Sequence, residues 1–155
     1  MVTLTVTLGL PASGKSTWAR TQHGYQATTD PARHGRLHHD QLVHSLQAEA
    51  RRQLAAGNDV ITDGCNLSAR LRRSWLQVGR DHGARCVLAI VECDPDEAIR
   101  RNLERPHGER VLPHRMDGYV RRLPEARTQV GGEGWDAIAY PLSCHVPAVG
   151  ATRAW

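Results

Sequence analysis

The chain has 155 residues, enough for one domain with its own hydrophobic core and too few for two domains of ordinary size. Its composition, 40% hydrophobic and 23% charged, excludes a disordered or collagen-like chain, and the net charge of +4 only weakly favours polyanionic partners. It has no apolar run of the roughly 18 residues that a membrane span needs and no signal-peptide pattern, so we expect a cytoplasmic protein without a membrane partner.

Short apolar runs with many β-branched residues alternate along the chain with amphipathic segments. The runs predict strands at residues 2–8, 24–29, 59–62, 86–91 and 138–140. The fourth run is apolar almost throughout, as is typical of a parallel strand covered on both faces. Strands that alternate with helices indicate an α/β fold, with a parallel sheet of four to five strands flanked by helices.

Capping residues and apolar spacing predict the helices between these strands. The expected helices begin at residue 16 and after Asp30-Pro31, and extend over residues 40–56, 68–83, 94–103 and 113–124. Pro124 is expected to end the last helix, because proline cannot donate the next backbone hydrogen bond. Residues 1–141 form the predicted domain, and residues 142–155 a C-terminal tail.

The helix predicted at residues 68–83 combines an apolar face with several arginines. The residues expected to point inward are Leu71, Trp75 and Val78. The arginines expected to lie elsewhere on the helix are Arg70, Arg72, Arg73 and Arg80. This pattern predicts a helix that covers the sheet with one face only.

A glycine-rich segment joins the first strand to the first helix. It matches the P-loop pattern G-x-x-x-x-G-K-[ST] at residues 9–16. Backbone N–H groups of such a loop bind phosphate oxygens, so we expect ATP or another nucleoside triphosphate here, with Mg²⁺. Lys15 is expected to reach the β- and γ-phosphates, and Ser16 to ligate Mg²⁺. The predicted nucleotide-binding residues of the loop are Gly9, Pro11, Ala12, Ser13, Gly14, Lys15, Ser16 and Thr17.

Two acidic residues end predicted strands, where ligands of open α/β sheets gather. Asp30 ends the second strand and is the strongest candidate for activating an acceptor hydroxyl, with Arg33 following it. Asp63 ends the third strand and is expected to approach Mg²⁺ through a water molecule. The alternatives are a helix cap for Asp30 and a plain turn for Asp63.

A cluster of arginines follows the fourth strand. Arg101 and Arg105 are four residues apart, so they are expected to share one helical face and to reach phosphates from a small lid. Arg100 lies beside them. Solvent-exposed surface arginines are the alternative interpretation.

Four segments together resemble the phage-type polynucleotide 5′-kinases, which belong to the P-loop kinases. Residues 9–20 look like that family's G-x-P-x-S-G-K-S-T-W-A-R opening, and residues 30–33 like its D-x-x-R. Residues 63–67 are similar to its D-x-x-N-L segment, and residues 101–105 to its lid motif R-N-x-x-R. The segments occur in the family's order, which implies a kinase of bacterial or phage-infected cytoplasm.

This resemblance implies roles on both sides of the reaction. Its acceptor would be the 5′-hydroxyl of a DNA or RNA end, with Asp30 as general base and Arg33 on the acceptor's phosphate. The implied substrate-binding residues are Asp30, Arg33, Asp63 and Asn66. The donor phosphates would be held by Arg101 and Arg105. The implied catalytic residues are Asp30, Lys15 and Arg105.

Two departures from the family keep other acceptors open. Pro31 follows the expected base, where the family has an acid or a small polar residue, and the segment between Asp30 and Asp63 is shorter than in the best-known member. The alternatives are a kinase of the same fold that acts on a nucleobase hydroxymethyl group or a small metabolite, and a nucleotide-binding switch without phosphoryl transfer. No obligatory protein partner is inferred.

Overall fold

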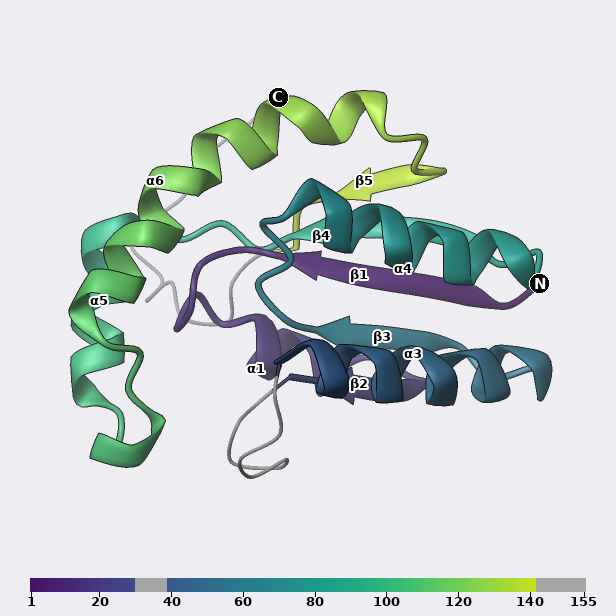
Figure 1. Cartoon of the computed structure of the whole chain (residues 1–155), viewed down its shortest axis with the longest axis horizontal. Helices are drawn as coiled ribbons and strands as arrows, with labels where there is room; N and C mark the ends of the chain where they lie inside the picture. The colour runs from purple at the N-terminus through teal and green to yellow at the C-terminus, as the bar shows by residue number, and fades with distance from the viewer. Residues whose placement is uncertain (30–38, 142–155) are drawn as a thin grey trace, which may run out of the picture.

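Five parallel strands form a single sheet in the computed structural model, which describes residues 1–29 and 39–141 (Figure 1). The strands are β1 Thr3–Leu8, β2 Tyr25–Thr28, β3 Val60–Asp63, β4 Arg85–Ile90 and β5 Ala137–Ala139. Their order across the sheet is β2-β3-β1-β4-β5, so β1 is central and is paired with β3 and β4. The predicted α/β fold with a parallel sheet of up to five strands is confirmed.

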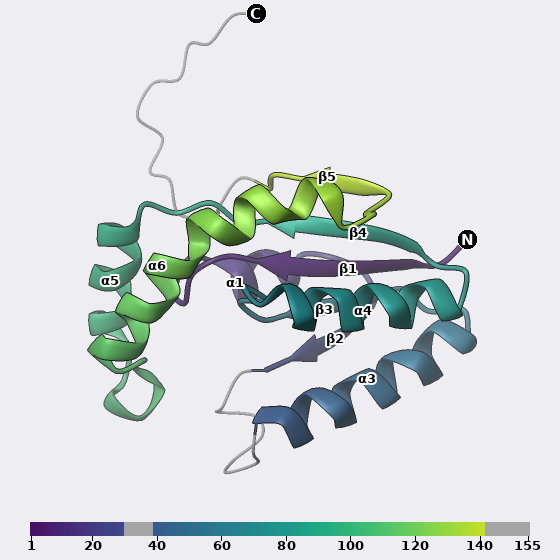
Figure 2. The ribbon, with the colours of Figure 1, turned by 45° about the horizontal axis from the view of Figure 1, so that its top comes forward.

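Helices cover both faces of this sheet. They are α1 Lys15–Ala19, α3 His39–Ala55, α4 Ala69–Asp81, α5 Pro95–Glu104 and α6 Pro113–Gln129, with two short 3₁₀ helices, η1 His107–Glu109 and η2 Val130–Gly132. Helices α3 and α4 pack side by side on one face, and α1 lies on the other (Figure 1 and Figure 2). None of the helices in the described part of the chain is long and apolar enough to cross a membrane.

Helix α6 continues past Pro124 to Gln129, so the prediction that this proline ends the helix is wrong. A proline inside a helix removes one backbone hydrogen bond and favours a bend. Figure 1 shows such a course: α6 first lies beside α5 and then turns to pass over the sheet towards β5. Ala126 and Val130, which follow the proline, are buried in the main core, and this packing favours continuation of the helix.

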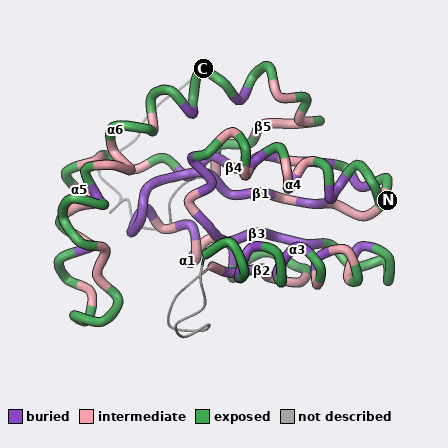
Figure 3. Tube along the Cα trace, in the orientation of Figure 1, coloured by how far each residue is buried: buried purple, intermediate pink, exposed green. Residues whose placement is uncertain are grey.

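The main core lies between the sheet and the helices, and Figure 3 shows buried residues running along β1 and β3. Leu4, Val6 and Leu8 of β1 are fully buried. A second, smaller cluster joins the P-loop to α5 and α6, and consists of Leu10, Ala98 and Met116. The α5–α6 hairpin is otherwise largely exposed (Figure 3).

Helix α4 differs from its predicted pattern at one residue. Trp75 and Val78 are buried as expected, and Leu71 is partly buried. Arg72, which was expected to lie outside the core, has a side chain that is 0% exposed. A buried arginine needs partners for its guanidinium, and the partner of Arg72 is Glu133, 61 residues further along the chain. Helical periodicity carries no information about such a partner.

Candidate active site

The P-loop leaves the carboxyl end of the central strand and wraps into a turn that few side chains tolerate. Gly9 donates its backbone N–H to the Cys65 carbonyl at 3.2 Å, and a Cβ at Gly9 would lie 2.7 Å from the Val91 carbonyl oxygen. Ala12 and Gly14 have φ values of 60° and 99°, in the left-handed region. Left-handed residues turn successive N–H groups towards one concave side, the arrangement that binds anions.

Lys15 is nearly buried, 6% exposed, and lies against its own loop. Its ammonium donates hydrogen bonds to the Leu10 carbonyl and, at 3.4 Å, to the Ser13 hydroxyl. Ser16 and Thr17 are half-buried at the start of α1, whose first turn contains no acidic residue. An ammonium, hydroxyls and backbone N–H groups without a competing carboxylate fit the phosphates of a nucleotide.

Asp63 ends β3 beside the P-loop strand and is 9% exposed. The Thr28 hydroxyl donates a hydrogen bond to its carboxylate at 3.2 Å. Ser16 and Asp63 supply oxygen ligands of the kind that Mg²⁺ prefers. Across residues 1–29 and 39–141, no group of three His, Cys, Asp or Glu residues could hold a metal alone. The chain's donor set therefore fits a Mg²⁺ ion that is shared with substrate phosphates and water.

The loop after Asp63 is bonded tightly to the central strand. Asn66 has a φ of 47° and donates its side-chain amide to the Thr7 carbonyl at 2.7 Å. The Thr7 hydroxyl lies 2.8 Å from the Thr62 and Gly64 carbonyl oxygens. Sequence reasoning missed Thr7; a threonine in a central strand that is expected to be buried on both faces was the available signal. The role of Asn66 as a substrate ligand remains a prediction.

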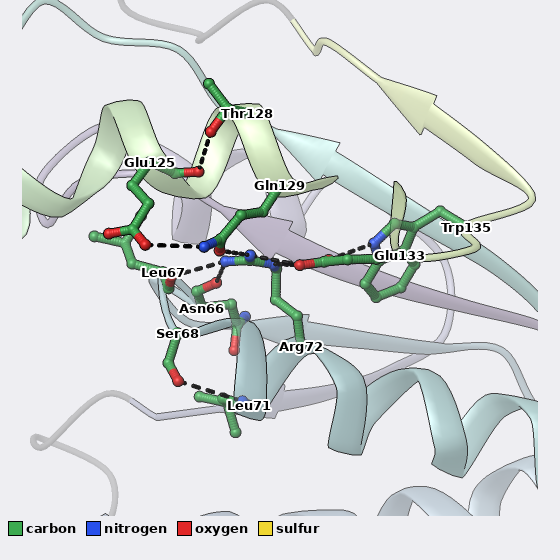
Figure 4. Close-up of polar contacts among 10 residues, drawn as sticks. All are labelled: Asn66, Leu67, Ser68, Leu71, Arg72, Glu125, Thr128, Gln129, Glu133 and Trp135. Carbon is green, nitrogen blue, oxygen red and sulfur yellow. Dashed lines mark hydrogen bonds and ion pairs between the residues drawn. The ribbon is translucent and has the colours of Figure 1, made fainter. Parts of the chain in front are cut away.

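Arg72 holds the far end of the same loop, as Figure 4 shows. Its Nη1 donates to the Asn66 carbonyl at 3.0 Å and to the Leu67 carbonyl at 2.7 Å. Its Nη2 donates to Gln129 at 3.1 Å and to the Glu133 carboxylate at 2.6 Å. One side chain therefore connects the loop after β3 to the end of α6. Sequence reasoning missed this connection.

Helices α5 and α6 form a hairpin beside the P-loop, at the position of the predicted lid (Figure 1); its role as a lid remains a prediction. The Asn102 side chain binds α5 to the connection that leads into α6, donating to the Val111 carbonyl at 2.8 Å and accepting from the Val111 N–H at 2.9 Å. Helix α5 ends at Glu104, and Arg105 follows it with an extended backbone, so the expectation that Arg101 and Arg105 share one helical face is wrong. Arg105 is the C-cap residue of α5, one position beyond the last helical residue, so the four-residue spacing does not place it on the helical face of Arg101.

Arg101 lies on α5 and contacts two residues near the start of that helix. Its Nε donates to Glu97 at 2.6 Å, and its Nη1 lies 3.8 Å from the Cys93 sulfur. Burial raises the pKa of the Cys93 thiol, while Arg101 and Lys15 act in the opposite direction. Arg101 therefore contacts Cys93, and the helix that bears Arg101 packs against the P-loop through Ala98 and Leu10.

Asp30 and Arg33, the predicted general base and acceptor-binding arginine, lie outside the described residues. Among the described residues, Asp63 and Asn66 lie beside the central strand that leads into the P-loop, and the α5–α6 hairpin packs on that loop. The roles of Asp30 and Arg33 remain predictions.

Comparisons with known proteins give the same fold. The model of a family described as AAA domain matches residues 4–125. Kti12 of Chaetomium thermophilum in complex with ADP-AlF3 is 19% identical and superposes with a TM-score of 0.71, over 94% of this chain and 92% of that one. The APS kinase CysC of Mycobacterium tuberculosis, in complex with AMPPNP and APS, is 18% identical with a TM-score of 0.56, over 90% of this chain and 88% of that one.

A third similar structure is larger than this chain. A chain of the Pnkp1/Rnl/Hen1 RNA repair complex is 20% identical with a TM-score of 0.70, over 83% of this chain but only 46% of that one. At these identities the similarity establishes a P-loop kinase fold and no particular substrate. The family match covers most of the chain, and the chain therefore belongs to the AAA domain family.

Proposed function

We propose that the chain is an ATP- and Mg²⁺-dependent kinase that transfers the γ-phosphate to the 5′-hydroxyl of a DNA or RNA end. The observation that carries this proposal is the packing of the α5–α6 hairpin, which bears Arg101, against the P-loop: Leu10 of the loop, Ala98 of α5 and Met116 of α6 form one buried cluster. A switch needs a P-loop, but it needs no lid arginine beside it. The likeness to a chain of an RNA repair complex supports a nucleic-acid acceptor.

The proposed transfer is in line and has no covalent enzyme intermediate. Asp30 accepts the proton of the 5′-hydroxyl while that oxygen forms a bond to the γ-phosphorus. The bond between the γ-phosphorus and the β–γ bridging oxygen breaks, and ADP leaves with the electron pair. Lys15, Arg101 and Arg105 stabilise the negative charge on the phosphoryl oxygens. Bound Mg²⁺, held through Ser16 and a water on Asp63, would supply further positive charge on the donor phosphates.

The acceptor is assigned through Arg33, which the motif places one helical turn after the base. A nucleoside 3′-monophosphate offers the anion that Arg33 would bind, and a free nucleoside offers the same hydroxyl without it. The added contact should improve both binding and alignment of the hydroxyl.

The test is phosphate transfer from labelled ATP to a panel of acceptors: 5′-hydroxyl oligonucleotides, nucleoside 3′-monophosphates, free nucleosides and sugars. We expect oligonucleotides and 3′-monophosphates to be labelled far better than free nucleosides. Arg33→Ala should raise the acceptor KM and remove most of this preference, without changing ATP affinity. Arg85→Ala is the matched control, because Arg85 is exposed and begins β4, at the amino ends of the strands and away from the P-loop.

Two outcomes would replace this proposal. Equal labelling of a free nucleoside, a sugar or a hydroxymethylated base would assign the chain to the kinases of small or nucleobase acceptors. ATP binding without labelling of any acceptor would favour the nucleotide-binding switch.

A further inference from the structure

Arg72 has a set of partners that helix packing alone does not require. Its side chain is 0% exposed and forms an ion pair with Glu133, whose side chain is 7% exposed. Burial alone would raise the pKa of Glu133, but the hydrogen bonds from Arg72 and Trp135 outweigh burial and lower it. The pair therefore stays ionised inside the protein. Because desolvation opposes a buried ion pair, such a pair is weak evidence of a stabilising role.

The loop that Arg72 holds contacts the donor site in three places. Asp63 begins it, and the Cys65 carbonyl accepts a hydrogen bond from Gly9, the first residue of the P-loop. Asn66 is bonded to the central strand and adopts a left-handed backbone conformation. Arg72 fixes the carbonyl groups of Asn66 and Leu67, at the end of this loop. A shift of these carbonyls would be transmitted along four residues to the Asp63 carboxylate.

The other partners of Arg72 belong to the helix that forms the lid. Gln129 ends α6 and is itself held by Glu125 at 3.0 Å, while Glu133 is held by Trp135 at 3.0 Å. Figure 4 shows these side chains meeting around the guanidinium. Nearer its start, α6 carries Met116, which packs in the same cluster as Leu10 of the P-loop. Helix α6 therefore touches the donor site directly through Met116 and indirectly through Arg72.

We propose that Arg72 is a positioning residue, which sets the place of Asp63 by holding the Asn66 and Leu67 carbonyls against the end of α6. This inference rests on the role of Asp63 in the proposed function. A planar guanidinium can donate to all these acceptors at once, whereas the lysine ammonium is a compact charge on a flexible chain. Replacing Arg72 by lysine would therefore keep the positive charge but lose the hydrogen bonds that position the two carbonyls.

The test uses Arg72→Lys, which keeps a positive charge beside Glu133 but loses the fork that binds the two carbonyls. The matched control is Arg80→Lys, on the same helix, where Arg80 pairs with Asp136 at 2.9 Å near the other end of α4. Two measurements apply: amide hydrogen exchange of residues 64–67, and affinity for a non-hydrolysable ATP analogue with and without Mg²⁺. Neither requires phosphoryl transfer.

We expect Arg72→Lys to speed exchange in residues 64–67 and to reduce the Mg²⁺-dependent gain in analogue affinity by roughly tenfold, the lower end for outer partners of metal ligands. Arg80→Lys should change neither quantity. In an Asp63→Asn background, Arg72→Lys should have almost no further effect on the Mg²⁺-dependent gain, because both changes act on the same carboxylate. Equal losses in both backgrounds would overturn the proposal, since a general loss of stability is additive.

Gln129→Ala provides a second variant if Arg72→Lys fails to fold. Gln129 is exposed, and its removal leaves no unpaired buried charge, yet it takes one hydrogen bond from Arg72. The same changes should appear in weaker form, about twofold to threefold; unchanged exchange and unchanged Mg²⁺ dependence in Gln129→Ala would contradict the proposal. A wild-type protein that binds the analogue with Mg²⁺ dependence but phosphorylates no acceptor would refute the kinase function and leave the positioning role standing.

Discussion

Lys15 and Arg101 lie in two regions that are held together by different interactions. Lys15 belongs to the P-loop at the carboxyl ends of the strands, called the sheet edge below, and Arg101 belongs to the α5–α6 hairpin. At the sheet edge, buried polar groups bond to one another: Thr7, Asn66 and Asp63 all have partners within 3.2 Å. In the hairpin, α5 and the first half of α6 contact the P-loop through one small apolar cluster, and the ion pairs within α5, such as Arg100 with Glu97, join largely exposed side chains.

These two kinds of interaction differ in how much rearrangement they allow. Leaving a buried polar group without its partner costs roughly 1–3 kcal/mol, so the sheet edge has few alternative arrangements. Exposed ion pairs contribute roughly 0–1 kcal/mol, so the hairpin can rearrange at low cost. We expect the sheet edge to be formed before the nucleotide arrives, and the hairpin to adjust around it.

The largest effect should come from Lys15→Ala at the sheet edge. The change removes the side-chain ammonium from a loop that otherwise binds phosphate through backbone N–H groups. Phosphoryl transfer should therefore be abolished, while the fold is retained. Transfer assays with labelled ATP and circular dichroism check the two parts. A folded variant with near-normal turnover would mean that the P-loop is not the donor site.

The next largest effect is expected for Arg105 in the lid. Arg105→Ala should reduce turnover on the order of 10³, as arginines acting on a phosphoryl transition state do, and Arg105→Lys should not restore it. Arg121→Ala is the control, since Arg121 is exposed on α6. Steady-state kinetics decide the matter: full activity in the lysine variant would show that charge alone suffices at this position.

The two regions should also differ in stability. Leu88→Ala removes a fully buried side chain from the main core and should lower the free energy of unfolding by roughly 2–5 kcal/mol. Met116→Ala, in the small lid cluster, should mainly speed amide exchange in α5 and α6. Chemical denaturation and hydrogen exchange separate these effects. An equal loss of global stability in both variants would mean that the lid and the sheet unfold as one unit.

The smallest effect is expected for Glu97→Gln. Hydrogen bonds from Arg100 and Arg101 lower the pKa of Glu97 to about 2, so it is ionised at neutral pH and orients the Arg101 guanidinium through Nε. Its neutralisation should raise the KM for ATP only severalfold, because Glu97 is partly exposed and its ion pairs are screened by solvent. Unchanged kcat with a raised KM is the expected signature; a large fall in kcat would mean that Glu97 acts on more than the orientation of Arg101.

The features that depend only on neighbouring residues could be predicted from the sequence. The P-loop was predictable because glycines and the lysine at fixed spacing, between a strand and a helix, define its geometry locally. The alternation of strands and helices was predictable because buried parallel strands leave apolar runs. These two features together were enough to predict the fold, while the roles of the donor-site residues remain predictions.

Residues whose partners are distant in the chain could not be placed from local patterns. Arg72 is buried because Glu133, 61 residues away, meets it across the end of α6, and no periodic pattern records such a pair. Helix α6 continues beyond Pro124 because Ala126 and Val130 are buried in the main core. In both cases, the energy of long-range packing outweighs the local preference, and that energy depends on which elements the strand order brings together.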